Sequence, residues 1–347
     1  IPRHFPGHSA GNAVFEFPDL RTAYVGDFDL VGFGPWYGSS DSDPMAFLDG
    51  QRSPLVSLYL GAAAGYAGAP FRVLRGGGAL GFAVGGAGDF NGDGFGDFAA
   101  STTPRPDSGQ PPARVLVFYS GPSGPGTGPN VVLADPAGSE EFGFGSALAA
   151  ADADGDGFAE LVVATESRRG TAEREGQVLV WSGGESGLVV SHFVALVNPA
   201  PQEGGRFGSS VADAGDLDGD GFDDVIIGAN RQGGDAQTGE AFVFAGAAAG
   251  ISITPGVRVG DPSGQAGAAF ATSIAPIGDA NGDGFPDVAV GAVSHTSTGR
   301  YAGAVFVYFG APTGVTAAAG AALGHPEGAA NDDRTNRLAM FGRSVAF

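Results

Sequence analysis

The sequence predicts an all-β fold, a β-propeller of four-stranded antiparallel blades, because it combines many turn residues, short apolar runs and a long internal period. Glycine and proline contribute 63 and 23 of the 347 residues, yet 43% of the residues are hydrophobic, which is typical of short strands joined by tight turns. An acidic nine-residue motif begins at Asp89, Asp152, Asp216 and Asp279, so its copies start 63, 64 and 63 residues apart. A constant period of this length indicates that one supersecondary unit is repeated along the chain.

Each period contains four apolar runs that predict the four strands of one sheet. In one period these runs are residues 207–212, 225–229, 241–244 and 257–259, and glycine or polar residues separate them. Four short antiparallel strands in series are typical of a propeller blade. We therefore expect a single domain over residues 1–347 with five repeats. The approximate repeat ranges are 18–79, 80–140, 141–205, 206–267 and 268–340.

The two ends of the chain match the repeat only in part. In the first repeat the spacing places Asp27 to Pro35 at the acidic loop, where Val31 and Pro35 replace two carboxylates, so no metal is expected there. Residues 341–347 begin with the Phe-Gly pair that opens other repeats and predict the first strand of a further or closing blade. Either the ends pair within one ring, of which this chain is all or a fragment, or a neighbouring subunit completes the open blade by strand addition.

The acidic motif has the form D-x-[DN]-x-D-G-x-x-[DE], which is the spacing of a calcium-binding loop. Calcium takes about six to eight oxygen ligands, whereas magnesium prefers a strict octahedron and zinc prefers nitrogen or sulfur. The glycine at position six permits the tight turn. By analogy with other loops of this form, positions one, three, five and nine supply side-chain oxygens and position seven a backbone carbonyl, while the phenylalanine ring at position seven turns into its own blade.

We therefore expect about four calcium ions, one in each loop. The predicted ligands are Asp89, Asn91, Asp93, Phe95 and Asp97; Asp152, Asp154, Asp156, Phe158 and Glu160; Asp216, Asp218, Asp220, Phe222 and Asp224; and Asp279, Asn281, Asp283, Phe285 and Asp287.

Charge and composition restrict the classes of partner. The formal net charge of -21 disfavours nucleic acid and anionic membranes, which require a basic face, and no run approaches the ~20 apolar residues of a membrane span. The chain has no cysteine, so disulfides and thiolate metal sites are excluded. Because like charges crowd in each acidic loop, folding should be linked to calcium. Extracellular modules bind calcium at ~10⁻⁴–10⁻³ M, which favours a secreted or cell-surface location.

The Phe-Gly-Ser-Ser-Val-Ala segment at residues 207–212, the acidic loops and the period together resemble the FG-GAP repeat, the propeller repeat of integrin α-subunits and of many bacterial secreted proteins. The resemblance covers roughly residues 20–347. The Gly-Ala-Pro signature of the family stands here as Gly228-Ala229-Asn230, so its third position differs. The resemblance implies a calcium-binding, non-enzymatic module for adhesion, binding or structure. Its partner would be a protein, a glycan or further copies of itself.

An enzyme is the rival hypothesis, since some propellers that resemble FG-GAP proteins are extracellular polysaccharide lyases or hydrolases. A catalytic site would then lie on the inter-blade loops, for example around His295, Arg300 and Tyr301, although a surface histidine is the simpler interpretation. Residues 7–11 match the G-x-S-x-G motif, but the motif needs a strand before it and a helix after it. No catalytic residue is therefore assigned.

The remaining histidines and the tryptophans carry weaker signals. Pro6 separates His4 from His8 and excludes a helical metal pair. Trp36 and Tyr37 lie in the first repeat and could stack on a sugar, whereas the position of Trp181 within a third-strand run predicts blade core.

Overall fold

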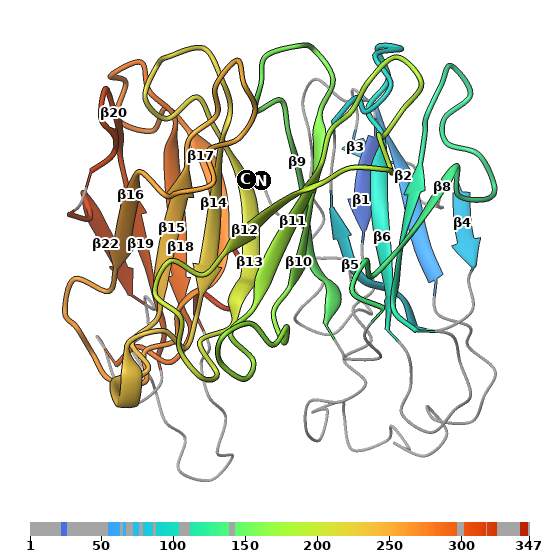
Figure 1. The fold of residues 1–347 in the computed structure, drawn as a ribbon. Coiled ribbons are helices and arrows are strands. Elements are labelled where there is room, and N and C mark those ends of the chain that lie inside the picture. The colour runs from blue at the N-terminus through green and yellow to red at the C-terminus, as the bar shows by residue number, and fades with distance from the viewer. Residues whose placement is uncertain are drawn as a thin grey trace, which may run out of the picture.

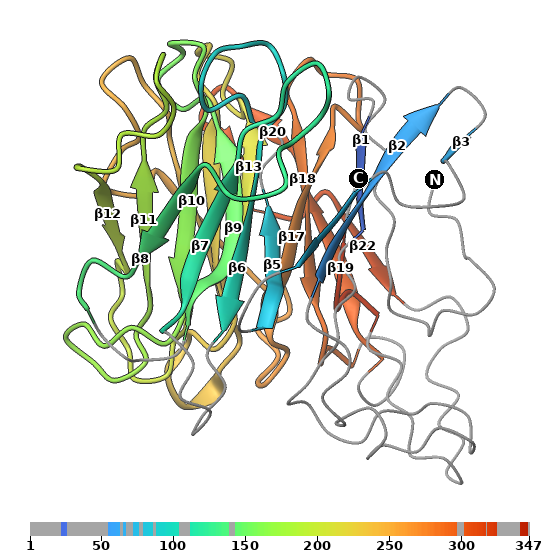
Figure 2. The ribbon, with the colours of Figure 1, turned by 90° about the vertical axis from the view of Figure 1, so that its right-hand side faces the viewer.

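The computed structural model describes residues 22–25, 55–62, 65–66, 72–75, 79–85, 88–103, 112–138, 143–296, 302–316, 318–324 and 341–345. Within these residues the fold is all-β apart from one short 3-10 turn, η1 (Gly234–Ala236). Figures 1 and 2 show the sheets standing side by side with their strands running between two loop-bearing ends. No helix of the described part is long and apolar enough to cross a membrane.

Four complete four-stranded antiparallel sheets form blades two to five. Blade two comprises β5 (Ala79–Gly85), β6 (Phe98–Thr103), β7 (Arg114–Phe118) and β8 (Val131–Ala134). Blade three comprises β9 (Phe144–Ala151), β10 (Glu160–Thr165), β11 (Gln177–Trp181) and β12 (Val194–Val197). Blade four comprises β13 (Phe207–Gly215), β14 (Asp224–Ala229), β15 (Glu240–Phe244) and β16 (Val257–Gly260). Blade five comprises β17 (Phe270–Gly278), β18 (Asp287–Ala292), β19 (Ala304–Tyr308) and β22 (Ala321–Gly324).

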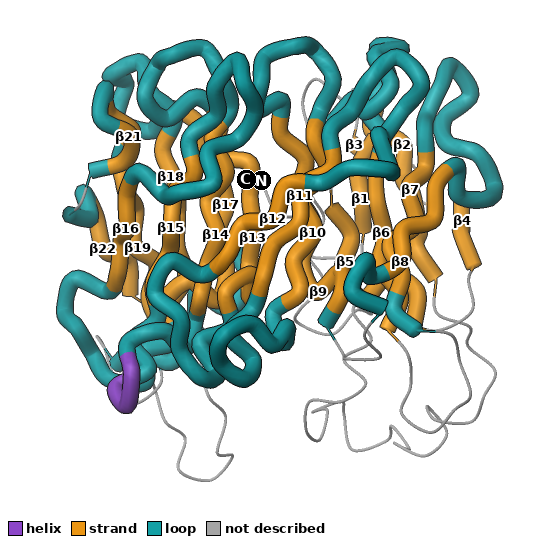
Figure 3. Tube along the Cα trace, in the orientation of Figure 1, coloured by secondary structure: helices purple, strands orange, loops and turns teal. Residues whose placement is uncertain are grey.

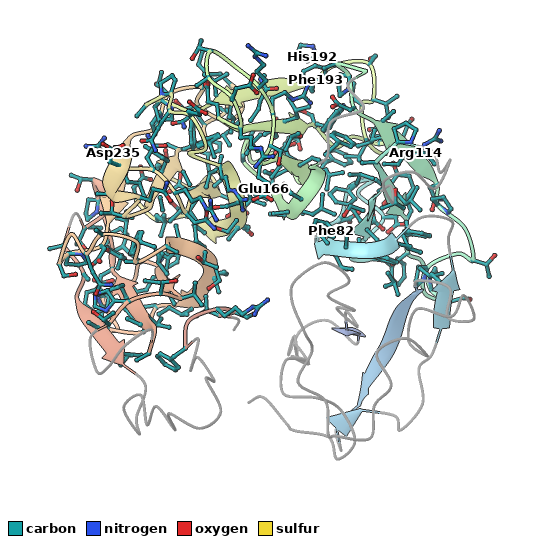
Figure 4. All side chains as sticks on the ribbon, turned by 90° about the horizontal axis from the view of Figure 1, so that it is seen from below. Phe82, Arg114, Glu166, His192, Phe193 and Asp235 are labelled. Atoms are coloured by element: carbon teal, nitrogen blue, oxygen red, sulfur yellow. The ribbon has the colours of Figure 1, made fainter. Side chains whose placement is uncertain are left out.

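In each of these blades the strands pair in chain order, so the acidic loop always joins the first strand to the second. A small hairpin of β20 (Gly310–Ala311) and β21 (Gly314–Val315) follows the third strand of blade five at the same end of the molecule as its acidic loop. The η1 turn lies at the other end (Figure 3). We call these the acidic-loop end and the opposite end. Seen from below, the blades follow one another round an arc (Figure 4).

Blade one differs from the expected repeat. Its described strands are β1 (Thr22–Val25), β2 (Leu55–Ala62), β3 (Gly65–Tyr66) and β4 (Arg72–Arg75). Strand β2 pairs with β4 on one side and with β1 on the other, so β1 holds the place of a second strand. The expected acidic loop at residues 27–35 follows β1 instead of preceding it, and this segment lies outside the described residues. The position of the acidic loop in blade one therefore stays a prediction.

The core lies between blades. One cluster joins blades three and four. Within it, the ring centroid of Phe207 lies 5.8 Å from that of Phe242 and 6.0 Å from that of Phe244. Burying a side chain of this size stabilises the fold by about 2–3 kcal/mol. Trp181 is only 2% exposed, which confirms its prediction as blade core. Phe118, the partner of Phe98, occupies the equivalent place in blade two.

The Phe-Gly pair is the element that docks each blade on the preceding one. Phe207 forms a parallel bridge with Gly176 of blade three, and a Cβ on Gly176 would lie 2.0 Å from the Phe207 carbonyl oxygen. Only glycine permits this close approach. Gly208 adopts a φ of 89°, whereas the equivalent residue of blade five, Ala271, is held at 61° without being glycine.

Phe341 and Gly342 dock on blade five in the same manner. The Phe341 N–H donates to the Ala302 carbonyl at 3.1 Å, and Ser273 Oγ donates to the Gly342 carbonyl at 2.9 Å. Ser210 Oγ makes the matching bond to Ala271 at 2.8 Å one blade earlier. Residues 342–345 are turn and bend rather than strand. Phe341 and Gly342 thus lie where the first residues of a following blade would dock. No strand of a sixth blade is formed in the described residues.

Candidate metal centres

The four acidic loops share one backbone geometry, which the aspartate at position one organises. Asp279 Oδ1 accepts from the backbone N–H groups of Gly282 and Asp283 at 2.7 and 3.0 Å, while its Oδ2 accepts from Gly284 at 2.9 Å. Glycines at positions four and six have positive φ in every loop, for example 79° and 94° at Gly282 and Gly284. The spacing of glycines in the motif follows from this left-handed backbone, which other residues adopt at a cost.

Two loops bring three carboxylates together. One ligand oxygen from each of Asp152, Asp154 and Asp156 lies within 4.8 Å of the others, and Asp216, Asp218 and Asp220 form the same group in blade four. These are positions one, three and five of the motif. Asp152 Oδ1 is buried and has no hydrogen-bond partner. An orphaned buried carboxylate oxygen beside two further carboxylates suits a hard divalent cation.

The loops of blades two and five carry an amide at position three. Asn91 Oδ1 accepts from the Asp93 N–H at 3.0 Å, and Asn281 Oδ1 accepts from the Asp283 N–H at 2.8 Å. The amide oxygen therefore occupies the place of the carboxylate in the other two loops. An amide oxygen is a suitable calcium ligand, but each of these loops holds one negative charge fewer.

The carboxylate at position nine is buried and already anchors backbone. Asp224 is 1% exposed, and its two oxygens accept from Leu217 in the loop at 3.1 Å and from Gly246 after the third strand at 3.0 Å. Asp97 and Asp287 make the matching pairs of bonds in their blades. The position-nine carboxylate is not part of the aspartate triads of positions one, three and five. Each oxygen keeps a second lone pair, so the residue ties the loop to the sheet whether or not it also contacts an ion.

Burial changes the acidity of these position-nine groups. It raises the pKa of Asp97 and Asp224 to about 7 and that of Glu160 to about 8, and the neighbouring loop carboxylates add to the rise against the opposing backbone N–H donors. A cation in the loop would counteract both causes, because it lowers the energy of the charged form. The Glu160 Oε1 atom, which is buried without a hydrogen-bond partner, is a further oxygen that a cation would satisfy.

The phenylalanine at position seven does not turn into its own blade as predicted. Its ring instead covers the position-four glycine of the preceding loop: a Cβ on Gly155 would lie 3.0 Å from the Phe222 ring, and one on Gly219 would lie 2.8 Å from that of Phe285. The turn of the loop leaves the ring outside its own sheet, where the glycine of the preceding loop offers a flat contact. The sequence does not show this, because the two residues belong to different repeats.

Backbone hydrogen bonds reinforce the same connection between loops. The carbonyl groups of Asp89 and Phe90 accept from Ala159 at 2.9 Å and Gly184 at 3.1 Å, both in the following blade. Blades three and four repeat this bond at Ala153, whose carbonyl accepts from Ala247 at 2.9 Å. Each loop is therefore part of the interface with the next blade.

His295, the centre of the rival enzyme hypothesis, lies at the opposite end and contacts the turn that follows β16. Its Nε2 lies 3.0 Å from Ser263 Oγ and 3.6 Å from Asp261 Oδ2, beside a pocket of about 500 Å³. Serine and aspartate thus face the same imidazole nitrogen, whereas a Ser-His-Asp triad needs them on different nitrogens. Arg300 and Tyr301 lie outside the described residues.

Equivalent pairs occupy the place of Asp261 and His295 in the other blades. They are Asp135 with Arg168, joined at 2.5 Å, and Asn198 with Gln232, joined at 3.1 Å. The pair therefore anchors the turn after the fourth strand to the next blade. An alignment of the repeats on one another would have revealed it, since the members recur at the same intervals as the acidic loops.

The other residues singled out in the sequence cannot be placed. His4, His8, residues 7–11, Trp36 and Tyr37 lie outside the described part of the chain.

The four complete four-stranded antiparallel sheets are consistent with the blades of an FG-GAP propeller. The FG-GAP family model matches residues 144–181, 207–244 and 270–308, which span the first three strands of blades three, four and five.

Among known proteins, the chain is distantly similar to integrin α subunits. It is 34% identical to integrin alpha-5 of Xenopus laevis over 180 residues, 35% identical to integrin alpha-4 of the same species over 159, and 33% identical to human integrin alpha-IIb over 163. These alignments cover 50%, 45% and 46% of this chain but only 17%, 15% and 15% of those subunits.

Proposed function

We propose that the chain is a secreted or cell-surface calcium-binding module that is not an enzyme and that acts through its surface in adhesion, binding or structure. The observation that carries the proposal is the pair of aspartate triads at Asp152, Asp154 and Asp156 and at Asp216, Asp218 and Asp220. Both sit in loops that also form the contact with the following blade. The distant similarity to integrin α subunits supports an extracellular role.

Calcium bound in these loops would neutralise the carboxylates and hold the backbone of positions one to six in place. Contacts within the chain would then extend this order from the loop to its own sheet and to the next blade. The position-nine carboxylate ties the loop to its own sheet, and the carbonyl groups of positions one and two accept from the next blade. A module of this kind presents a rigid surface for a protein, a glycan or a further copy of itself.

Thermal unfolding with about 1 mM calcium and then with a chelator tests the proposal. We expect a rise in melting temperature of about 5 °C or more with calcium, and the rise should shrink in the variant D154N/D156N. A control variant, E203Q/D235N, removes two exposed acidic groups at the opposite end and should keep the full rise. A melting temperature that does not change on addition of calcium would refute the proposal.

Self-assembly through β22, the fourth strand of blade five, is part of the proposal. Leu323 is 52% exposed, whereas its equivalents Leu133, Leu196 and Val259 are 5%, 0% and 2% exposed beneath a following blade. An apolar residue left in this position favours a further blade from the same ring or from another subunit. Light scattering should show assemblies that Leu323→Glu reduces. A parent protein that is monomeric at all concentrations would refute self-assembly. It would not affect the proposal of a calcium-binding module.

A further inference from the structure

Two of the four acidic loops contain the dipeptide Asn-Gly, which is chemically reactive. The pairs are Asn91-Gly92 in blade two and Asn281-Gly282 in blade five. In such a pair the glycine nitrogen can attack the side-chain carbonyl carbon of asparagine, because the two atoms close a five-membered ring and glycine has no side chain to obstruct the approach. The sequence has no third Asn-Gly pair, so the two loops can be compared directly.

The hydrogen bonds inside the two loops are the same. In blade five the Gly282 N–H donates to Asp279 Oδ1 at 2.7 Å, and Asn281 Oδ1 accepts from the Asp283 N–H at 2.8 Å. The equivalent bonds in blade two measure 2.7 and 3.0 Å. The second of these donors faces the amide oxygen, on which negative charge develops when a nucleophile attacks the adjoining carbon. The local geometry therefore equips both loops alike for the reaction.

Contacts with the next blade distinguish the two loops. A Cβ on Gly92 would lie 2.4 Å from the ring of Phe158, and a backbone N–H of blade three donates to the same loop at 2.9 Å. Among the described residues, by contrast, no atom lies within 4 Å of a Cβ on Gly282. Asn281 is exposed, whereas Asn91 is half-buried. The loop of blade two is thus covered, and that of blade five is open to solvent.

This cover controls how easily the loop opens. For the attack, the glycine nitrogen must leave its hydrogen bond to the position-one aspartate and turn toward the asparagine side chain. Local opening of this kind is rarer where neighbouring groups pack on the segment. Blade three opposes the motion in the loop of blade two, and no described residue opposes it in the loop of blade five. The two loops should therefore react at different rates, although their internal bonds agree.

We propose that Asn281 is a site of spontaneous deamidation, whose aspartate product completes a third aspartate triad in the loop of blade five. The Gly282 nitrogen forms a bond to Asn281 Cγ, the Cγ–Nδ2 bond breaks, and ammonia leaves with the proton of the glycine nitrogen. Water then opens the cyclic imide at either of its carbonyl groups and leaves aspartate or isoaspartate at this position.

The aspartate product would give the loop of blade five the same carboxylates as the loops of blades three and four. Asn281 is position three of the motif, which Asp154 and Asp218 occupy in the two triads. A further negative charge beside Asp279 and Asp283 strengthens the attraction for a divalent cation. Isoaspartate instead lengthens the backbone by a methylene group and displaces the turn. This consequence rests on the proposed calcium-binding function, whereas the deamidation itself does not.

Peptide mapping by mass spectrometry tests the inference on the intact protein, kept at mildly alkaline pH with calcium or with a chelator. The two asparagines lie in different tryptic peptides, because arginines separate them in the sequence. We expect Asn281 to deamidate about ten times faster than Asn91. Chelation should speed the reaction further, because an ion bound by the loop oxygens holds the loop closed. An intact Asn281, or equal rates at the two asparagines, would overturn the inference.

Removing a covering ring tests the cause of the difference. F158A uncovers the loop of blade two and should bring the rate at Asn91 close to that at Asn281. F222A is the matched control, because it removes the equivalent ring from Gly155, in a loop without asparagine. In this control both rates should equal those of the parent, and melting temperatures establish that both variants are folded during the incubation. A rate at Asn91 that F158A leaves unchanged would overturn the role of the cover.

The variant N281D tests the consequence for calcium. Its melting temperature should respond at an about threefold lower calcium concentration than that of the parent. Q237E adds the same charge at an exposed position of the opposite end and should respond like the parent. Equal responses of N281D and Q237E would refute the third triad. If calcium changes none of these melting temperatures, the proposed function fails, while the mapping of Asn281 and Asn91 still decides the deamidation.

Discussion

The ring of Phe158 lies on Gly92, although the two residues belong to acidic loops of successive blades. A Cβ on Gly92 would lie 2.4 Å from Phe158 Cε1. The two loops also share the hydrogen bond from the Ala159 N–H to the Asp89 carbonyl. A loop ordered by an ion would therefore offer the next blade a fixed surface, and the neighbouring acidic loops are in physical contact.

Gly92→Ala should destabilise the protein by about 2–3 kcal/mol, from overpacking against the ring together with a φ of 70° that alanine tolerates poorly. Gly282→Ala is the matched control, because Gly282 has a φ of 79° but no atom within 4 Å of the added methyl. It should cost only about 1 kcal/mol. Chemical denaturation in calcium measures both. Equal losses would show that the contact with Phe158 contributes nothing.

The calcium-free protein should lose stability as pH rises from about 4.5 to 8. The pKa values of Asp97, Asp224 and Glu160 are raised in the fold to about 7, 7 and 8, so the folded state holds protons that the unfolded state releases at lower pH. By linkage the penalty grows across this window and is complete above pH 8. Calcium should remove it, so the calcium-induced rise in melting temperature should be larger at pH 8 than at pH 5. Titrations at pH 6.5 in buffers of different ionisation enthalpy should show proton release on binding, and its absence would contradict the assignment.

Arg168→Gln should destabilise the fold by about 3 kcal/mol, because it leaves the buried Asp135 carboxylate without its counter-charge. Adding Asp135→Asn should recover most of the loss. The double variant reproduces the Asn198 and Gln232 pair that blade four uses at the same place. Denaturation of the parent, both single variants and the double variant measures the coupling, and strictly additive losses would show that the two side chains act independently.

Ala271→Gly should stabilise the protein by about 0.5–1 kcal/mol. Ala271 has a φ of 61° at the position where other blades place glycine, and glycine relieves this strain. The reverse change, Gly208→Ala, should destabilise, since its Cβ would lie 3.0 Å from that of Ala164. Melting temperatures in calcium are sufficient to compare them. A loss on Ala271→Gly would mean that the methyl group contributes more by packing than it costs in strain.

The sequence by itself determined the features that depend on local spacing. The 63-residue period identified the blade, and the short apolar runs identified its strands. The Asp-x-Asp-x-Asp-Gly spacing identified the loops in which Asp152 to Asp156 and Asp216 to Asp220 converge. The acidic loops can be predicted from sequence because the backbone geometry of a tight turn constrains residues only a few positions apart.

Only the tertiary structure decided how successive repeats meet. It placed the Phe158 ring on Gly92, committed Asp224 to two backbone donors, put β1 in a second-strand position and joined Asp135 to Arg168 of the next blade. These contacts join residues from different loops and blades. They depend on the angle and register at which one blade packs on another, and no local pattern in a single chain specifies that geometry.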